Sequence, residues 1–282
     1  MTNKYLFYNY LPILADHILD IKYNNRIVHH SYPPFIIDNI KEGDTIFVKT
    51  DLLPMFFKQI CPRIKKHFYL LTGVAGLDIQ EHYKIFIEQY KIIKWIGCNI
   101  LFDHEKVFKI PIGFAENENE EGNQLLLDEL YNNKIPLDNK INKILITPMG
   151  NTHDDRNNIL SIFNNKDYCN ILKDRIPFKE FMNEINRFKF VLCPRGRGTD
   201  THRFWEILLM GSIPIVEKSG LDSLYKLFPC IIVDSYSDIN SDLINQYKID
   251  NELIDNIDKF LVIDNFCNMI NNIKSIWYNF HL

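Results

Sequence analysis

The amino-acid sequence predicts an α/β protein with two facing Rossmann-like domains, each built on a parallel sheet, and a cleft between them. Three observations support this fold class. Continuous apolar runs alternate with amphipathic stretches, as expected for buried parallel strands separated by helices. The alternation breaks once, in a polar stretch near the middle, and then restarts. A chain of 282 residues also suits two domains of about 100–150 residues each.

In the first half, runs rich in β-branched and aromatic residues predict strands. These runs are residues 44–50, 67–73, 92–100 and 107–114. Amphipathic stretches at 52–64 and 81–92 predict the helices between the first three strands. Residues 5–9 and 33–43 indicate a further strand and helix upstream.

The middle of the chain is polar. Residues 115–123 are acidic and predict a surface loop, and residues 132–143, which contain a proline, predict a linker. Beyond it the expected strands are 143–150, 168–173, 189–194, 212–217 and 229–234, and the expected helices are 154–165, 177–188, 200–211, 221–228 and 265–277. We therefore divide the chain into an N-terminal domain, residues 1–138, and a C-terminal domain, residues 139–282. The last helix is a candidate to pack back on the N-terminal domain.

Composition restricts the function classes. A net charge of −4 and a pI near 6.1 argue against a general nucleic-acid or anionic-membrane binder, whose surface would be basic. The six cysteines form no CxxC pair and lie mostly in apolar runs, which favours free thiols over disulfides or a zinc site. Neither a signal peptide nor an apolar run of about 18 residues is present. We expect a cytoplasmic protein without a membrane span.

The segment VLCPRGRGTDTHRFWEILLMGSIPIVEKS, residues 191–219, combines the features of an anion site. A strand leads into an Arg- and Gly-rich turn and then into a helix. Glycines permit close ligand approach and positive φ, a Thr or Asp cap leaves helix N–H groups free, and helix N-termini and arginines bind phosphate. The predicted diphosphate-binding residues are Arg195, Gly196, Arg197, Gly198, Thr199, Asp200, Thr201, His202 and Arg203.

Each of these assignments has a structural alternative. Arg195 and Arg197 could pair with Asp200 or Glu206 and only stabilise the turn. Glu206 could accept hydrogen bonds from ribose hydroxyls or pair with Arg203, three residues before it.

Residues 147–156 resemble a second phosphate element, with Gly150 at a strand end and Arg156 on the following helix. Arg156 could instead pair with Asp154 or Asp155. Because ligands bind beyond the carboxyl ends of strands in such sheets, Gly150 and Arg195 are expected on one rim of the cleft. The residues expected on the opposite rim are Thr50, Asp51, Thr72 and Gly73.

Two local clusters contain ligand-type side chains without the spacing of a metal site. They are His153 to Asp155 and Asp103 to Glu105. Loops or helix caps explain both clusters, and the sequence predicts no metal site.

Residues 188–216, FKFVLCPRGRGTDTHRFWEILLMGSIPIV, resemble the C-terminal donor-binding motif of exostosin-like glycosyltransferases. That motif has a strand, a CPRG turn, an Arg and a Glu on the next helix, and a G-x-I-P-V/I strand. The stretches GDTIFVKTDLLP (43–54) and KVFKIPIGF (106–114) support the resemblance more weakly. The similarity is to compact members without a membrane anchor, including those of large DNA viruses, for which the compartment would be host cytoplasm.

The resemblance implies a GT-B fold, with the nucleotide-sugar donor bound mainly by the C-terminal domain and the acceptor mainly by the N-terminal domain. It implies inverting transfer from a nucleoside-diphosphate sugar, UDP-linked in this family, to a glycan hydroxyl, without a bound metal or another cofactor. It suggests diphosphate and ribose roles for Arg195, Arg197, Arg203 and Glu206.

An inverting transfer needs a general base near the acceptor hydroxyl. Our candidate is Asp51, which follows the strand at 44–50 and could instead cap the next helix. Asp16, His17 and Asp78 are further candidates, and the expected catalytic set is Asp51, Arg195 and Arg203.

Two other function classes remain at this point. One is a non-catalytic protein that binds a nucleotide sugar or a glycan. The other is a nucleic-acid-binding protein that uses the arginine-rich turn, which the acidic charge balance disfavours.

Overall fold

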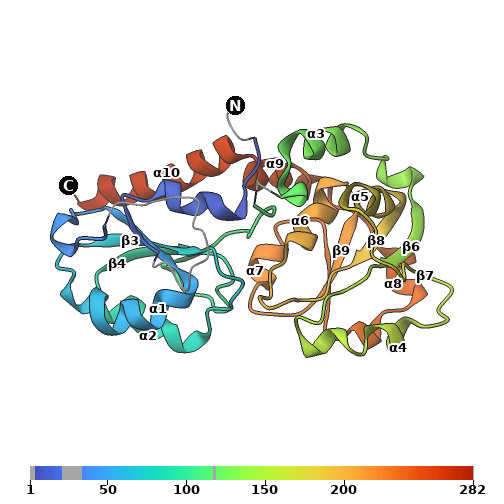
Figure 1. Ribbon diagram of the computed structural model, residues 1–282, viewed down its shortest axis with the longest axis horizontal. Coiled ribbons are helices and arrows are strands. Elements are labelled where there is room, and N and C mark those ends of the chain that lie inside the picture. Colours follow the sequence, from blue (N-terminus) through green and yellow to red (C-terminus); the bar gives the residue numbers. More distant parts are fainter. Residues whose placement is uncertain (1–3, 21–33, 117–118, 282) are drawn as a thin grey trace.

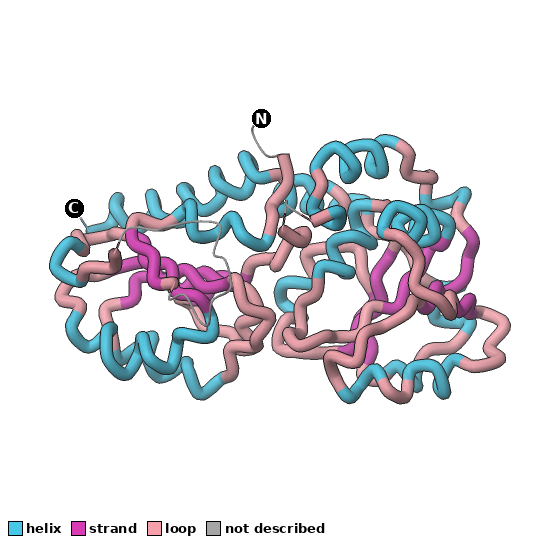
Figure 2. Tube along the Cα trace, in the orientation of Figure 1, coloured by secondary structure: helices cyan, strands magenta, loops and turns pink. Residues whose placement is uncertain are grey.

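The computed structural model describes residues 4–20, 34–116 and 119–281. Within them the chain forms two separate five-stranded sheets, and every strand pair is parallel. Helices pack on the faces of both sheets (Figures 1 and 2). The predicted fold class is confirmed: the protein is α/β, with two Rossmann-like halves in a GT-B-like arrangement.

The first sheet runs in chain order. Its strands are β1 His17–Leu19, β2 Thr45–Lys49, β3 Phe68–Gly73, β4 Ile92–Gly97 and β5 Val107–Lys109. Right-handed crossovers that always step in one direction place their helices on one face of a sheet. α1 (Leu53–Met55), which runs into a π-helical turn at Phe56–Ile60, and α2 (Ile85–Gln89) lie on this face (Figure 1).

The two ends of the chain cover the opposite face of the first sheet. α10 (Ile263–His281) returns from the C-terminal domain and packs there with the 3₁₀ helix at Tyr8–Leu14 (Figure 1). Phe266 of α10 is buried together with Phe47 of β2 and Leu71 of β3. The sequential strand order explains this return, because no crossover helix is available for that face.

The second sheet has a different order, β10-β9-β8-β6-β7. Its strands are β6 Ile141–Ile146, β7 Cys169–Ile171, β8 Phe188–Leu192, β9 Ile213–Glu217 and β10 Ile231–Val233. Its helices are α3 Gln124–Asn132, α4 Ile159–Phe163, α5 Phe178–Arg187, α6 His202–Leu209, α7 Asp222–Tyr225, α8 Ser241–Gln246 and α9 Asp255–Leu261. The chain enters at β6, steps to β7 on one side and continues from β8 on the other. This order creates a topological switch point between β6 and β8, where doubly wound sheets bind ligands.

Some expected elements differ from the structure. Residues 5–9 form no strand: Tyr5 and Phe7 make isolated bridges only, and the edge strand is β1, too short to show a sequence pattern. The helix expected at 33–43 is a single 3₁₀ turn, Ile37–Asn39. The sequence did not predict α3, which lies before the expected boundary at 138/139 and whose buried Leu127 and Leu130 share a hydrophobic core with Phe181 and Met182 of α5.

The remaining global expectations concern cysteines and membranes. All six cysteines are unpaired. Over the ranges that the structure describes, no helix combines the length and the apolar character needed to cross a bilayer.

Candidate functional site

The site lies where two loops leave adjacent strands of the second sheet. The Gly150 loop (residues 147–153) follows β6, and the arginine turn (residues 194–201) follows β8. β6 and β8 flank the switch point, the position at which parallel α/β sheets bind ligands. The fold therefore brings together the two phosphate-binding elements that the sequence predicts separately.

Arg156 fastens these two loops to each other. Its Nε donates to the carbonyl of Arg195 at 2.7 Å, its Nη2 to that of Pro194 at 3.1 Å, and its Nη1 to that of Gly150 at 3.2 Å. Burial, followed by the charge of Arg203, lowers the pKa of Arg156. Arg156 thus positions the loops by binding carbonyls, rather than pairing with a neighbouring aspartate.

The two glycines of the arginine turn serve close packing. Neither Gly196 nor Gly198 has a positive φ, so the expected left-handed conformation is wrong. A Cβ atom on Gly198 would lie 2.9 Å from Nδ2 of Asn99, and one on Gly196 would lie 3.2 Å from Nη2 of Arg156. A side chain on Gly198 would therefore require Asn99 of the N-terminal domain to shift, and one on Gly196 would press against Arg156.

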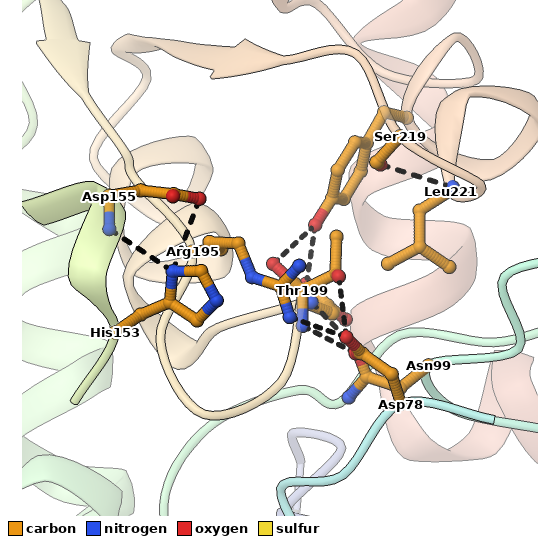
Figure 3. Close-up of polar contacts among 10 residues, drawn as sticks. Asp78, Asn99, His153, Asp155, Arg195, Thr199, Ser219 and Leu221 are labelled. Carbon is orange, nitrogen blue, oxygen red and sulfur yellow. Dashed lines mark hydrogen bonds and ion pairs between the residues drawn. The ribbon is translucent and has the colours of Figure 1, made fainter. Parts of the chain in front are cut away.

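A buried carboxylate of the N-terminal domain holds the arginine turn (Figure 3). Arg195 Nη2 donates to Asp78 Oδ2 at 2.5 Å, and Thr199 donates its backbone N–H to Oδ1 at 2.7 Å and its hydroxyl to Oδ2 at 3.1 Å. The Asp78 side chain is only 6% exposed. Arg195 therefore pairs with Asp78 rather than with Asp200 or Glu206. Both carboxylate oxygens of Asp78 accept hydrogen bonds in these contacts, which argues against Asp78 as the general base.

Asp200 also belongs to the contact between the domains. Its buried carboxylate accepts hydrogen bonds from Ile112 N at 2.8 Å, Trp205 Nε1 at 3.0 Å and Tyr225 Oη at 3.3 Å. Its own backbone N–H donates to Asn99 Oδ1 at 2.7 Å. Burial raises the pKa of Asp200 to about 7, although these donors oppose the shift. Asp200 and Thr199 thus hold the domains together.

The first turn of α6 carries the other predicted groups. Thr201 is the N-cap residue, without a side-chain cap hydrogen bond. His202 Nδ1 lies 2.8 Å from the carbonyl of Gly113, and its ring meets Tyr8 edge-on. Each of these contacts fixes the start of α6 against residues of the N-terminal half.

Arg203 and Glu206 act as a pair on α6. Arg203 donates to the Thr147 hydroxyl, and its guanidinium stacks 4.3 Å from the centre of the Phe181 ring. Its Nε lies 3.4 Å from Oε2 of Glu206. Burial raises the pKa of Glu206 and Arg203 opposes the shift. The i,i+3 pair is present, and both side chains also face a cavity.

This cavity, which we call the Arg203 cavity, has a volume of about 270 Å³, close to the lower limit of small-molecule sites at about 300 Å³. Its lining residues are Glu121, Pro148, Gly150, Arg175, Ile176, Phe178, Phe181, Arg203 and Glu206. The cavity thus joins the end of β6 with the starts of α5 and α6. Arg175 and Glu121 were not predicted, because they come from a loop and a 3₁₀ turn outside any sequence motif.

Arg197 and Asp51 are the predicted site residues that remain accessible. Arg197 is exposed and makes no hydrogen bond or ion pair with the described residues. Burial raises the pKa of Tyr8. The negative charge of Asp51 raises this pKa further, and the positive charge of Arg197 lowers it. Asp51 of the N-terminal domain and Arg197 of the C-terminal domain therefore lie within electrostatic range of the same phenol.

Asp51 lies in the 3₁₀ turn Thr50–Leu52, beyond the carboxyl end of β2. Its side chain is 40% exposed and lies 3.6 Å from Lys49 Nζ. The helical elements after β2 show no side-chain cap hydrogen bond, so Asp51 does not act as their cap.

The other expected rim residues are internal. Thr50 donates to the carbonyl of Gly73, and the Thr72 hydroxyl accepts from Trp95 Nε1. Both threonines are buried. They therefore support the sheet edge and do not face a ligand.

Two further base candidates lie at the opposite, amino end of the first sheet. Asp16 accepts from the backbone of Thr45, and His17 Nε2 pairs with Asp44 at 2.7 Å. Asp20, which the sequence analysis missed, follows the carboxyl end of β1. Burial and the nearby Asp51 raise its pKa, while Lys49 lowers it.

The two ligand-type clusters form ion pairs. His153 Nδ1 lies 3.1 Å from Asp155 (Figure 3), and Asp103 pairs with Lys109. In the part of the chain that the structure describes, no three or more His, Cys, Asp or Glu side chains group around a position for a metal ion.

No model of a protein family matches the chain, and no curated protein matches it significantly.

Proposed function

We propose that the protein is an inverting glycosyltransferase that moves a sugar from a nucleoside-diphosphate sugar, UDP-linked, to a glycan hydroxyl. One observation supports it most: the Gly150 loop, the arginine turn and the start of α6 converge at the switch point, beside a cavity that Arg203 and Glu206 line. A dinucleotide-like ligand suits this position in a doubly wound sheet.

In this proposal the donor spans from the Arg203 cavity to the arginine turn. Glu206 accepts hydrogen bonds from the ribose hydroxyls, and Arg203, Arg197 and the N-terminus of α6 bind the diphosphate. Each charged hydrogen bond contributes about 1.5–3 kcal/mol. Arg195 uses one amino group on Asp78, which leaves the other for a phosphate oxygen. Arg156 holds both loops in place by donating hydrogen bonds to their backbone carbonyls.

The transfer step needs a base and a stabilised leaving group. The acceptor hydroxyl attacks the anomeric carbon from the face opposite the diphosphate, and Asp51 takes its proton. The bond between the anomeric carbon and the β-phosphate oxygen breaks, and the electron pair leaves with the nucleoside diphosphate. Fixed positive groups stabilise that charge where it develops. Asp51 suits the base role because its side chain is accessible and, like Arg197, lies within electrostatic range of Tyr8.

The test combines binding with turnover. The protein is titrated calorimetrically with UDP and with several UDP-sugars, with and without EDTA, and each donor is then incubated with glycan acceptors while released UDP is measured. Micromolar to low-millimolar binding that persists in EDTA, together with UDP release, would support the proposal. If no nucleoside diphosphate binds at millimolar concentration, the proposal is wrong.

A second candidate is a non-catalytic nucleotide-sugar-binding protein. The ion pair of Asp51 with Lys49 favours it, because Lys49 occupies an oxygen that a base would need. Such a protein would bind the donor but show neither transfer nor slow donor hydrolysis.

A further inference from the structure

The Arg203 cavity contains a second charged pair that belongs to no motif. Arg175 comes from the loop between β7 and α5, and Glu121 from the 3₁₀ turn Glu120–Gly122. A Cβ atom on Gly150 would lie 3.4 Å from Nη2 of Arg175. Both side chains are exposed, and neither makes a hydrogen bond or ion pair with the described residues. Two unpaired, opposite charges thus face one cavity.

These groups come from other elements than those assigned to ribose and diphosphate, although they line the same cavity. Arg203 and Glu206 come from α6, whereas Arg175 is contributed by the adjoining β7–α5 loop, next to the apolar side chains of Ile176 and Phe178. Apolar side chains beside charged groups suit a planar nucleobase, which has apolar faces and a polar edge. Beside Arg203 and Glu206, the cavity therefore presents side chains of the kinds that can bind the base of a nucleotide.

The hydrogen-bonding groups of Arg175 and Glu121 determine which edge of a nucleobase they can bind. An arginine side chain only donates hydrogen bonds, and an ionised carboxylate only accepts them. The guanidinium fork matches an oxo oxygen, which has two lone pairs, better than a ring nitrogen, which has one. A carboxylate matches a ring N–H. Uracil and guanine carry an oxo group beside a ring N–H, whereas cytosine and adenine carry an amino group beside a bare ring nitrogen.

We propose that Arg175 and Glu121 select the base of the donor, with Arg175 donating to the oxo oxygen and Glu121 accepting from the adjacent ring N–H. This inference rests on the proposed function and adds the residues that determine nucleotide specificity. Uracil and guanine share the required edge, so UDP and GDP are separate arms of the test. Each has a size-matched counterpart without that edge, CDP and ADP.

The experiment measures dissociation constants of UDP, CDP, GDP and ADP by calorimetry. The proteins are the wild type, Arg175→Ala, Glu121→Gln and the control Arg187→Ala, which removes an exposed arginine that pairs with Glu184 on α5. The wild type should bind UDP or GDP at least tenfold more tightly than its amino counterpart. Arg175→Ala should bring that ratio close to one, and Glu121→Gln should reduce it. Arg187→Ala should leave it unchanged.

Three results would overturn the inference or its premise. A wild type that prefers CDP or ADP overturns it directly. Equal weakening of UDP and CDP by Arg175→Ala would show a phosphate contact and also overturns it, while the glycosyltransferase proposal stands. If none of the four nucleotides binds the wild type, the proposed function itself fails. Ligand-free melting temperatures and Arg175→Gln separate loss of contact from misfolding.

Discussion

Arg195 Nη2 lies 2.5 Å from Oδ2 of Asp78, a carboxylate that the N-terminal domain contributes to the arginine turn of the C-terminal domain. The pair joins residues 117 positions apart. Because Asp78 also accepts two hydrogen bonds from Thr199, one carboxylate fixes both the turn and the contact between the domains. The geometry of the candidate site therefore depends on this contact.

We expect Asp78→Ala to destabilise the protein by about 1.5–3 kcal/mol, because Thr199 and the partly exposed Arg195 lose a charged hydrogen-bond acceptor. The free energy of unfolding, measured by urea denaturation, tests this. The matched control is Asp234→Ala, which removes a carboxylate in an exposed pair with Lys218 and should change stability by less than about 1 kcal/mol. Equal changes in the free energy of unfolding of the two variants would show that the Asp78 contact stabilises the protein no more than an exposed ion pair does.

Arg203→Ala should weaken binding of the donor nucleotide by about 10- to 150-fold, the equivalent of one charged hydrogen bond. Arg203→Lys should recover little of this loss, because lysine lacks the planar fork and the stacking on Phe181. Calorimetric titration with UDP measures both variants, and Arg187→Ala is the control. Full recovery of the affinity in Arg203→Lys would show that Arg203 contributes only its positive charge.

If Asp51 is the base, Asp51→Asn should lower kcat by about 10²–10⁴-fold and leave the dissociation constant of the donor unchanged. Asp38→Asn, an exposed aspartate in a 3₁₀ turn away from the strand end, is the control. Product formation under saturating donor and acceptor gives kcat. Unchanged turnover in Asp51→Asn would exclude Asp51 as the base. Asp20, which follows the carboxyl end of the adjacent strand β1, would then be the next candidate.

The sequence predicts the parts of this site that follow strands. Apolar runs locate β6 and β8 closely, and parallel pairing brings Gly150 and Arg195 to the same sheet edge. The partners in the other loops could not be predicted. Glu121 and Arg175 lie in a turn and a loop without periodicity. Asn99 ends a run predicted as a strand, and Asp78 was expected only as a candidate base, so their contacts with the arginine turn depend on how the two domains meet.

The roles of Gly196, Gly198 and Arg156 also could not be predicted from the sequence, because they depend on long-range contacts. Their residue types indicate an anion site, and the Arg-Gly pattern is equally compatible with tight packing. In the structure Gly198 makes room for Asn99, and Arg156 binds three carbonyls. Only long-range contacts decide between a ligand contact and a structural one.

The buried carboxylate of Asp200 predicts a pH dependence of stability. Its pKa rises from 3.8 to about 7 on folding, so the folded protein holds a proton there that the unfolded chain has released. The free energy of unfolding should therefore fall as pH rises from about 4 to 7, by at most about 1.4 kcal/mol per pH unit. Glu206, whose pKa burial also raises, acts in the same direction. Above pH 7 the lowered pKa of buried Lys140, about 7, acts in the opposite direction.

Urea denaturation between pH 5 and 7 of the wild type and Asp200→Asn tests this prediction. In that range the carboxylates with lowered pKa, Glu42, Asp103 and Asp128, are largely ionised in both states and contribute little slope. Asparagine cannot take up the proton, so the variant should show a flatter dependence on pH, whatever its absolute stability. The slope is the readout because the amide also changes the hydrogen bonds with Trp205 and Tyr225. An unchanged slope would mean that Asp200 is ionised throughout, stabilised by its hydrogen-bond donors.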